Sequence, residues 1–138
     1  MKMLVLGASE ELLAFLDGEA ELLPTEERYP LIAVMPSTEM PEGRLRCDLL
    51  QLWDENAGEV LRKVEAESVV SCGFAPHCTL TLSSMEPERS VLTVQRAWLR
   101  ADGTELSQQE IPLPQAWSRL SAEERIMLAG IRLLTGTL

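Results

Sequence analysis

The first half of the chain alternates short apolar runs with helical or loop segments, and this alternation restricts the fold more than any other feature. The apolar runs are residues 2–6, 29–35, 47–53 and 68–74. Residues 29–35 are largely apolar, which is typical of a strand buried on both faces of a parallel sheet. Strands that alternate with crossover segments favour a parallel sheet with right-handed crossovers. We therefore expect the first half to form such a sheet.

The second half carries a different pattern, which predicts β-hairpins and a final helix. Residues 91–100 read as one long strand, and Asp102 with Gly103 forms a favoured hairpin turn that returns the chain through residues 105–113. Ser121 and Glu124 have the spacing of a capping box, which predicts a helix start, and Gly136 predicts its end. An apolar stripe on one face of this helix is expected to be buried.

Length and composition are those of one globular domain. The chain has 138 residues, of which 46% are hydrophobic and 25% charged. We predict a single α/β domain over residues 1–138, with a parallel half (1–75) and a hairpin and C-terminal helix half (76–138). Its sheet is expected to be small, mostly parallel and Rossmann-like, with an antiparallel hairpin extension. No apolar run approaches the roughly 20 residues that cross a bilayer, and three cysteines are typical of a reducing cytoplasm rather than a disulfide framework.

The charge balance disfavours nucleic acids and anionic membrane surfaces as partners. The formal net charge is −10, and most of the excess acid lies in residues 1–70. Nucleic acids and anionic membrane surfaces attract clustered Lys and Arg, whereas this chain has no basic run. We expect no nucleic acid and no membrane partner. The partner is expected to be a protein or a second copy of the chain in a homodimer, with residues 91–100 as a strand that leaves an edge or an apolar face to cover.

Gly7, Ala8 and Ser9 stand where a nucleotide-binding sheet places its phosphate loop. Neither the Gly-x-Gly-x-x-Gly nor the Gly-Lys-Ser/Thr pattern occurs in the chain. Glu10 and Glu11 at the helix start would repel a phosphate. We interpret the turn as structural, with Ser9 as the N-cap of the following helix, and keep Gly7 and Ser9 as candidate ligand-binding residues.

Cys72, Gly73, His77 and Cys78 form the most conspicuous cluster, just beyond a predicted parallel strand, where open α/β sheets place their sites. A zinc site would need a fourth ligand, which Cys47 could supply only if the fold brought it close. A Cys–His nucleophile pair would need an orienting acid, and neighbours on an extended backbone point apart. The favoured interpretation is a buried Cys72 and an exposed His77. Cys72, Gly73 and His77 remain candidate ligand residues, and no catalytic residue, metal ligand or cofactor is predicted.

Acidic pairs at residues 10–11, 26–27 and 54–55 could bind Mg²⁺ or act in acid–base catalysis. Each pair stands where a helix start or a solvated loop is expected. We interpret them as surface groups.

Residues 68–136 follow the order of one part of a known enzyme family. Four features follow one another in the same order as in the Mur ligases. They are residues 69–74 (Val-Val-Ser-Cys-Gly-Phe), the hairpins, residues 111–114 (Ile-Pro-Leu-Pro) and the helix through residues 128–133. The chain resembles the central domain of these ATP-dependent peptidoglycan enzymes. It departs from them in having no P-loop, and residues 118–121 replace their His-Asn pair. The resemblance implies a scaffold that has lost ligation.

These observations favour a non-catalytic binding or protein-interaction domain, because the apparatus of catalysis is missing from the motifs. Two alternatives stay open. One is a small-ligand site at the strand ends near Gly7, Pro36 and Gly73. The other is a metal-binding protein or an enzyme that uses Cys72, His77 and Cys78.

Overall fold

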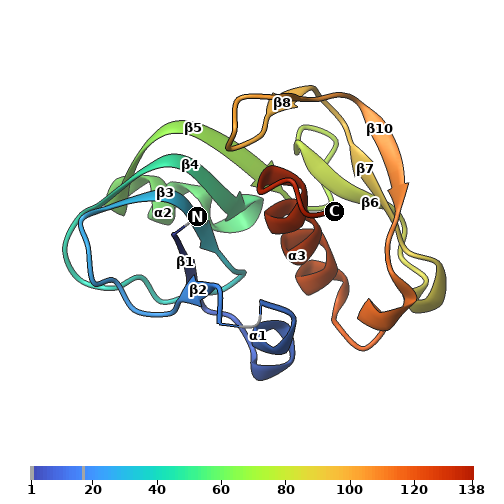
Figure 1. Ribbon diagram of the computed structural model, residues 1–138, viewed down its shortest axis with the longest axis horizontal. Coiled ribbons are helices and arrows are strands. Elements are labelled where there is room, and N and C mark those ends of the chain that lie inside the picture. Colours follow the sequence, from blue (N-terminus) through green and yellow to red (C-terminus); the bar gives the residue numbers. More distant parts are fainter. Residues whose placement is uncertain (1, 17) are drawn as a thin grey trace.

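The computed structural model describes residues 2–16 and 18–138 and builds them around one mixed sheet with helices on both faces (Figure 1). The strand order in this sheet is β10-β7-β6-β5-β4-β3-β1-β2. Its strands are β1 (Met3–Leu6), β2 (Ala20–Glu21), β3 (Arg28–Val34), β4 (Leu45–Trp53), β5 (Val64–Cys72), β6 (Leu80–Ser84), β7 (Val91–Val94) and β10 (Gln109–Pro112). The predicted α/β class is confirmed.

The remaining elements are three helices, three short 3-10 turns and a small hairpin, counted over the described residues. The helices are α1 (Glu10–Leu16), α2 (Ala57–Lys63) and α3 (Ala122–Leu134). The turns are η1 (Asp54–Asn56), η2 (Pro87–Arg89) and η3 (Gln115–Trp117), and β8 (Trp98–Leu99) pairs with β9 (Glu105–Leu106) as a separate ladder. Every described helix falls short of the length and apolarity that a bilayer crossing requires.

Strands β1, β3, β4 and β5 pair in parallel, as the alternating pattern of the first half predicts. The two-residue strand β2, which no apolar run predicted, adds to the same sheet parallel to β1. The side chains of the parallel strands enter two cores because both faces of the sheet are covered. Val5 and Leu31 point to the face packed by α1 and α3, whereas Leu4 and Ile32 point to the face that contains Val60 of α2. Burial on both faces explains why β1 and the second half of β3 read as continuous apolar runs.

The prediction of one long strand over residues 91–100 is wrong, because the chain leaves the sheet after Val94. The Gln95 backbone N–H donates to the Thr79 carbonyl (2.8 Å), and its side-chain amide donates to the carbonyls of Cys78 (2.7 Å) and Ala75 (3.3 Å). These bonds to a neighbouring loop turn the backbone away from β10. The predicted hairpin turn at residues 102–103 does form, but between the short strands β8 and β9.

This break also changes the edge of the sheet. β7 pairs with β6 on one side and β10 on the other, so residues 91–94 lie inside the sheet and not at an edge. The edge strands are β2 and β10, and β10 has four residues that end in Pro112. Short edges and proline discourage strand-to-strand association.

Helix α3 is buried almost all round, and the expectation of one buried face was too narrow. Continuous burial runs from Arg125 to Ile131 and includes Leu133 and Leu134. The helix lies between the parallel strands and β6, β7 and β10, where the sheet curves around it (Figure 1). Apolar neighbours on several sides explain why polar residues are confined to the helix ends.

Both ends of α3 are fixed as the sequence predicts. The Ser121 hydroxyl accepts from the Glu124 N–H (3.1 Å), and the Glu124 carboxylate accepts from the Ser121 N–H (3.0 Å), which confirms the capping box. After the last turn, the Thr137 N–H donates to the Arg132 carbonyl (2.7 Å) and the Gly136 N–H to the Leu133 carbonyl (3.2 Å). This pair of bonds is a Schellman ending with glycine in the left-handed region.

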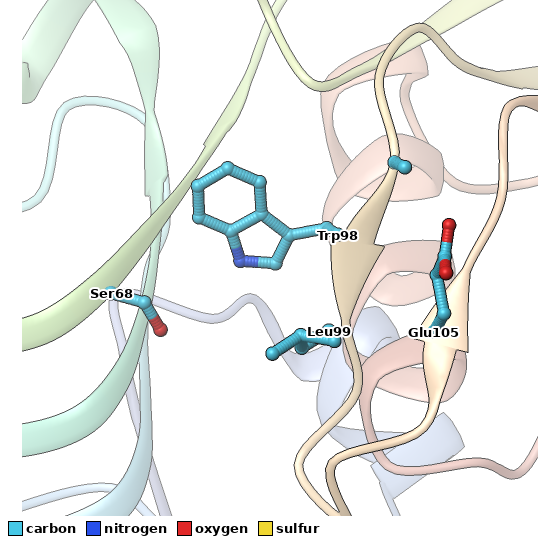
Figure 2. A pocket seen from close by; sticks show the side chains of 5 residues that line it. Ser68, Trp98, Leu99 and Glu105 are labelled. Carbon is cyan, nitrogen blue, oxygen red and sulfur yellow. The ribbon is translucent and has the colours of Figure 1, made fainter.

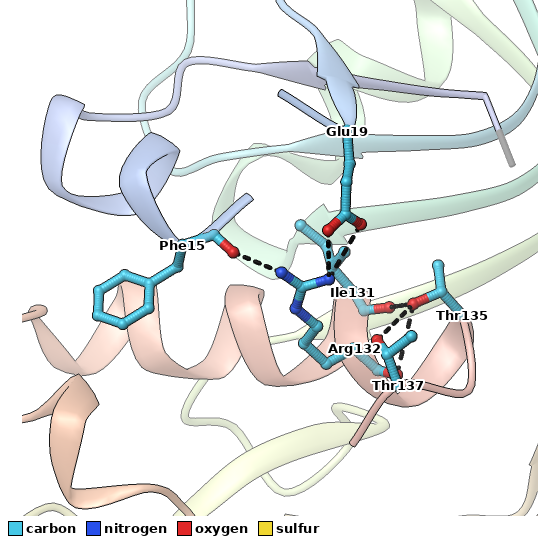
Figure 3. Close-up of polar contacts among 6 residues, drawn as sticks. All are labelled: Phe15, Glu19, Ile131, Arg132, Thr135 and Thr137. Carbon is cyan, nitrogen blue, oxygen red and sulfur yellow. Dashed lines mark hydrogen bonds and ion pairs between the residues drawn. The ribbon is translucent and has the colours of Figure 1, made fainter. Parts of the chain in front are cut away.

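Arg132 connects α3 to the first helix (Figure 3). Its guanidinium donates to the Phe15 carbonyl at the end of α1 and to both carboxylate oxygens of Glu19 (3.1 and 3.3 Å). The arginine side chain is 16% exposed, so the pair is partly shielded from water. The first and last helices are thereby held together on one face of the sheet.

Candidate functional site

A cleft of about 430 Å³ lies at the carboxyl edge of the parallel strands. It is bordered by the turns that follow β1, β3, β4 and β5 and by the first turn of α3. The lining residues are Gly7, Ser9, Met35, Pro36, Ser37, Trp53, Glu55, Phe74, Ser121, Glu123 and Glu124. Open parallel sheets bind ligands at this edge because the loops that leave the strands converge there. The candidates Gly7 and Ser9 both line the cleft.

Gly7 is required by a close approach of two loops. Its φ is +82°, and a Cβ built there would lie 2.1 Å from Oγ1 of Thr38. The Thr38 hydroxyl is in turn engaged, because it donates to the Met35 carbonyl at 2.6 Å. Gly7 therefore allows the turns after β1 and β3 to pack side by side under the cleft.

Ser9 acts as the N-cap of α1, as its position predicts. Its hydroxyl oxygen accepts from the Leu12 N–H (3.2 Å) and its hydroxyl group donates to the Glu124 carboxylate of α3. Partial burial tends to raise the pKa of Glu124, but the hydrogen bonds from Ser9 and from Ser121 outweigh burial and hold this pKa below its ordinary value. One carboxylate thus fixes the starts of two helices beside the cleft.

The opposite wall of the cleft is aromatic. Trp53 and Phe74 meet edge to face, with ring centroids 5.4 Å apart and ring planes at 80°. Trp53 is almost fully buried, whereas Phe74 is 46% exposed. The two rings stand at or just beyond the ends of the neighbouring strands β4 and β5, and both residues line the cleft.

The carboxylates of the cleft have no basic partner within residues 2–16 and 18–138. The ion pairs of that range involve other acids, and none includes Glu55, Glu123 or Glu124. Ser37, on the loop between these walls, has a φ of 57° and is the single non-glycine residue with positive φ among the described residues. Such backbone strain concentrates at binding sites.

Cys72 lies in the core below the cleft and does not line it. It is the last residue of β5, is fully buried, and its Cα pairs with Trp53. The pKa of the Cys72 thiol lies far above its ordinary value. Burial is the main cause, and the neighbouring Cys78 is the second. Cys47 faces the other core and lies six positions before Trp53 in β4, about 20 Å away along the strand. The fold therefore does not bring Cys47 to Cys72.

His77 and Cys78 lie together with Asp54, a residue that the cysteine–histidine pattern did not include. His77 is exposed, and its Nε2 is 2.8 Å from Oδ1 of Asp54. Cys78 is buried, and this burial is the main reason why the pKa of its thiol is raised. The negative charge of the Asp54 carboxylate is the second reason. The expectation that His77 and Cys78 point apart fails, because residues 75–78 form a turn closed by the Cys78 N–H and the Ala75 carbonyl (3.1 Å).

A second, apolar cavity of about 330 Å³ lies beneath the β8–β9 hairpin. Figure 2 shows Trp98 and Leu99 reaching from β8 toward Ser68 of β5. Ala97 and Glu105 complete the lining. The sequence carried no signal for this cavity because it depends on the break of the strand after Val94.

Comparison with known proteins gives no assignment. No protein-family model matches the chain, and neither the curated proteins nor the solved structures include a significant match.

Proposed function

We propose that this protein is a non-catalytic binding domain and that its ligand site is the cleft at the carboxyl edge of the parallel sheet. The observation that carries the proposal is the convergence of four strand ends and the start of α3 on one cleft. Its volume of about 430 Å³ falls within the roughly 300–1,000 Å³ that is common for ligand pockets. Loops on a rigid sheet supply such a site with little cost in ordering.

The lining chemistry favours a positively charged group as the ligand. Glu55, Glu123 and Glu124 place three carboxylates around the cleft, and the protein as a whole carries a net charge of −10. An amine or guanidinium would gain hydrogen bonds from the carboxylates and an aromatic contact from Phe74. The group can belong to a small amine or to a basic side chain of a partner protein.

The state of the cysteines supports binding rather than covalent catalysis. The thiolate is the nucleophilic form of cysteine, and burial raises the pKa of both Cys72 and Cys78. His77 is bonded to Asp54 and not to either thiol. The kinship with Mur ligases remains a proposal that rests on the order of elements over residues 68–136.

A ligand screen by thermal shift tests the proposal, because a ligand that binds only the folded state raises the melting temperature. We expect agmatine, spermidine or an arginine-rich peptide to stabilise the protein, and neutral compounds of similar size to leave it unchanged. ATP and UDP-sugar peptidoglycan precursors in the same screen test the resemblance to Mur ligases.

Matched variants locate the site. Glu123→Gln removes a cleft carboxylate, whereas Glu110→Gln removes an exposed one on β10. We expect the first variant to weaken binding of the cation several-fold and the second to leave it unchanged. Equal effects of the two variants, or no stabilisation by any cation, would show that the cleft is not a cation site.

A further inference from the structure

Asp54, His77 and Cys78 bring three different metal-ligating groups to one point. The carboxylate oxygen, imidazole nitrogen and thiol sulfur all lie within 4.8 Å of one another. Asp54 opens η1 directly after β4, and the other two residues belong to the turn that follows β5. Because β4 and β5 are parallel neighbours, both loops emerge at the same edge of the sheet.

Gln95 and Gly73 hold this cluster in place. The side-chain amide of Gln95 donates to the Cys78 carbonyl (2.7 Å) and fixes the turn that carries His77 and Cys78. A Cβ built on Gly73 would lie 3.0 Å from the Cys78 sulfur and 3.2 Å from Cβ of Asp54. The absence of a side chain at Gly73 therefore lets the thiol and the aspartate approach each other.

From this geometry we infer that Asp54, His77 and Cys78 form a site for Zn²⁺ or a similar divalent transition metal. Tetrahedral zinc with bonds of about 2.0–2.3 Å separates its ligand atoms by about 3.3–3.6 Å. His77 Nε2 and Asp54 Oδ1 are 2.8 Å apart, and no pair of the three ligand atoms is more than 4.8 Å apart, so shifts of roughly an ångström suffice. The His77 side chain is 64% exposed and is free to make such a shift.

The donor set also selects the metal. Thiolate and imidazole favour zinc, whereas Mg²⁺ and Ca²⁺ prefer sites built from oxygen ligands. Three protein ligands leave a fourth position of the tetrahedron on the exposed side of His77, where water or an outside donor can bind. The site does not depend on the cation proposed for the cleft, since none of its three ligands lines the cleft.

Cobalt provides the test, because Co²⁺ replaces Zn²⁺ and absorbs in the near ultraviolet when a cysteine thiolate binds it. The full chain, reduced and freed of metal with a chelator, would be titrated with Co²⁺ and then with Zn²⁺. We expect the thiolate band to saturate at one Co²⁺ per chain, to disappear on addition of Zn²⁺, and to persist in excess Mg²⁺.

Three variants decide which residues bind. His77→Ala changes an exposed side chain and is expected to fold, with a metal affinity lower by at least about tenfold. Cys78→Ser is expected to remove the thiolate band. Glu59→Gln, at an exposed acid of α2 that lies outside both the cluster and the cleft, is expected to keep the affinity of the original protein. The absence of the band in the original protein, or equal affinity in the original protein and His77→Ala, overturns the inference.

Discussion

Gly130 occupies the middle of a buried helix because a side chain from the sheet fills the space beside it. A Cβ at Gly130 would lie 2.6 Å from Nε2 of Gln51. The same amide nitrogen donates to the Met127 carbonyl at 2.8 Å, and Gln51 is fully buried. A glycine that is unfavourable for the helix alone therefore permits the helix to dock on β4.

The first prediction follows from this contact. Alanine normally stabilises a helix by about 1 kcal/mol relative to glycine, yet Gly130→Ala is expected to lower the free energy of unfolding by about 1–3 kcal/mol through overpacking. Gly58→Ala in α2 is the matched control, because nothing lies within 4 Å of its Cβ position. We expect the control to be neutral or slightly stabilised in urea denaturation. A Gly130→Ala protein as stable as the original would show that Gln51 moves aside freely.

At the scale of elements, the carboxylate of Glu124 connects the starts of α1 and α3. The folded protein holds the pKa of Glu124 below the ordinary value of 4.5. The folded state therefore binds this proton less readily than the unfolded chain. The stability that Glu124 contributes is complete at pH values above the ordinary pKa of the unfolded chain. It is lost as the pH falls through the lowered pKa of the folded protein.

Glu124→Gln is therefore expected to cost stability at neutral pH, by about 0.5–1 kcal/mol, and to cost less in acid. Urea denaturation at about pH 7 and about pH 3 would measure the difference between the original protein and the variant at each pH. Glu123→Gln, in the same helical turn but without the bond to Ser9, should show no such change between the two conditions. A difference that persists unchanged in acid would contradict the assigned role of the carboxylate.

The elements that sequence patterns predicted well are those set by local rules. The parallel strands, the N-cap at Ser9, the capping box at Ser121 and the end at Gly136 all depend on residues close together in the chain. The break after Val94 could not be predicted, because it depends on hydrogen bonds from Gln95 to a loop about 20 residues earlier. The nearly complete burial of α3 likewise depends on the sheet curving around it.

The same distinction applies to the candidate site. The strand-end position of Gly7, Ser9 and Gly73 follows from the general rule for parallel sheets. The approach of Asp54 to His77 does not, because it needs the adjacency of β4 and β5 and the turn at residues 75–78. The available signal was that residue 54 directly follows an apolar strand.

At the scale of the molecule, α3 packs against strands of both halves of the chain. Its apolar side chains share one core with residues of β1, β3 and β7. We therefore expect residues 1–75 and 76–138 to unfold together. Tryptophan fluorescence reports on Trp53, Trp98 and Trp117, which are spread over both halves, and circular dichroism reports on the backbone.

The two signals are expected to give the same midpoint in urea. Leu128 in α3 is fully buried, so Leu128→Ala should shift both midpoints together and lower the free energy of unfolding by about 2–5 kcal/mol. Two separated transitions in the original protein, or a shift in one signal alone, would indicate independent halves.

The late position of α3 in the chain bears on how the protein is made. A ribosome synthesises β1 to β10 before residues 122–134, which fill the hollow of the curved sheet. Until that segment leaves the exit tunnel, the apolar surface that it covers stays open to solvent and to other nascent chains. Protection by a chaperone during this interval is therefore expected to raise the yield of folded protein.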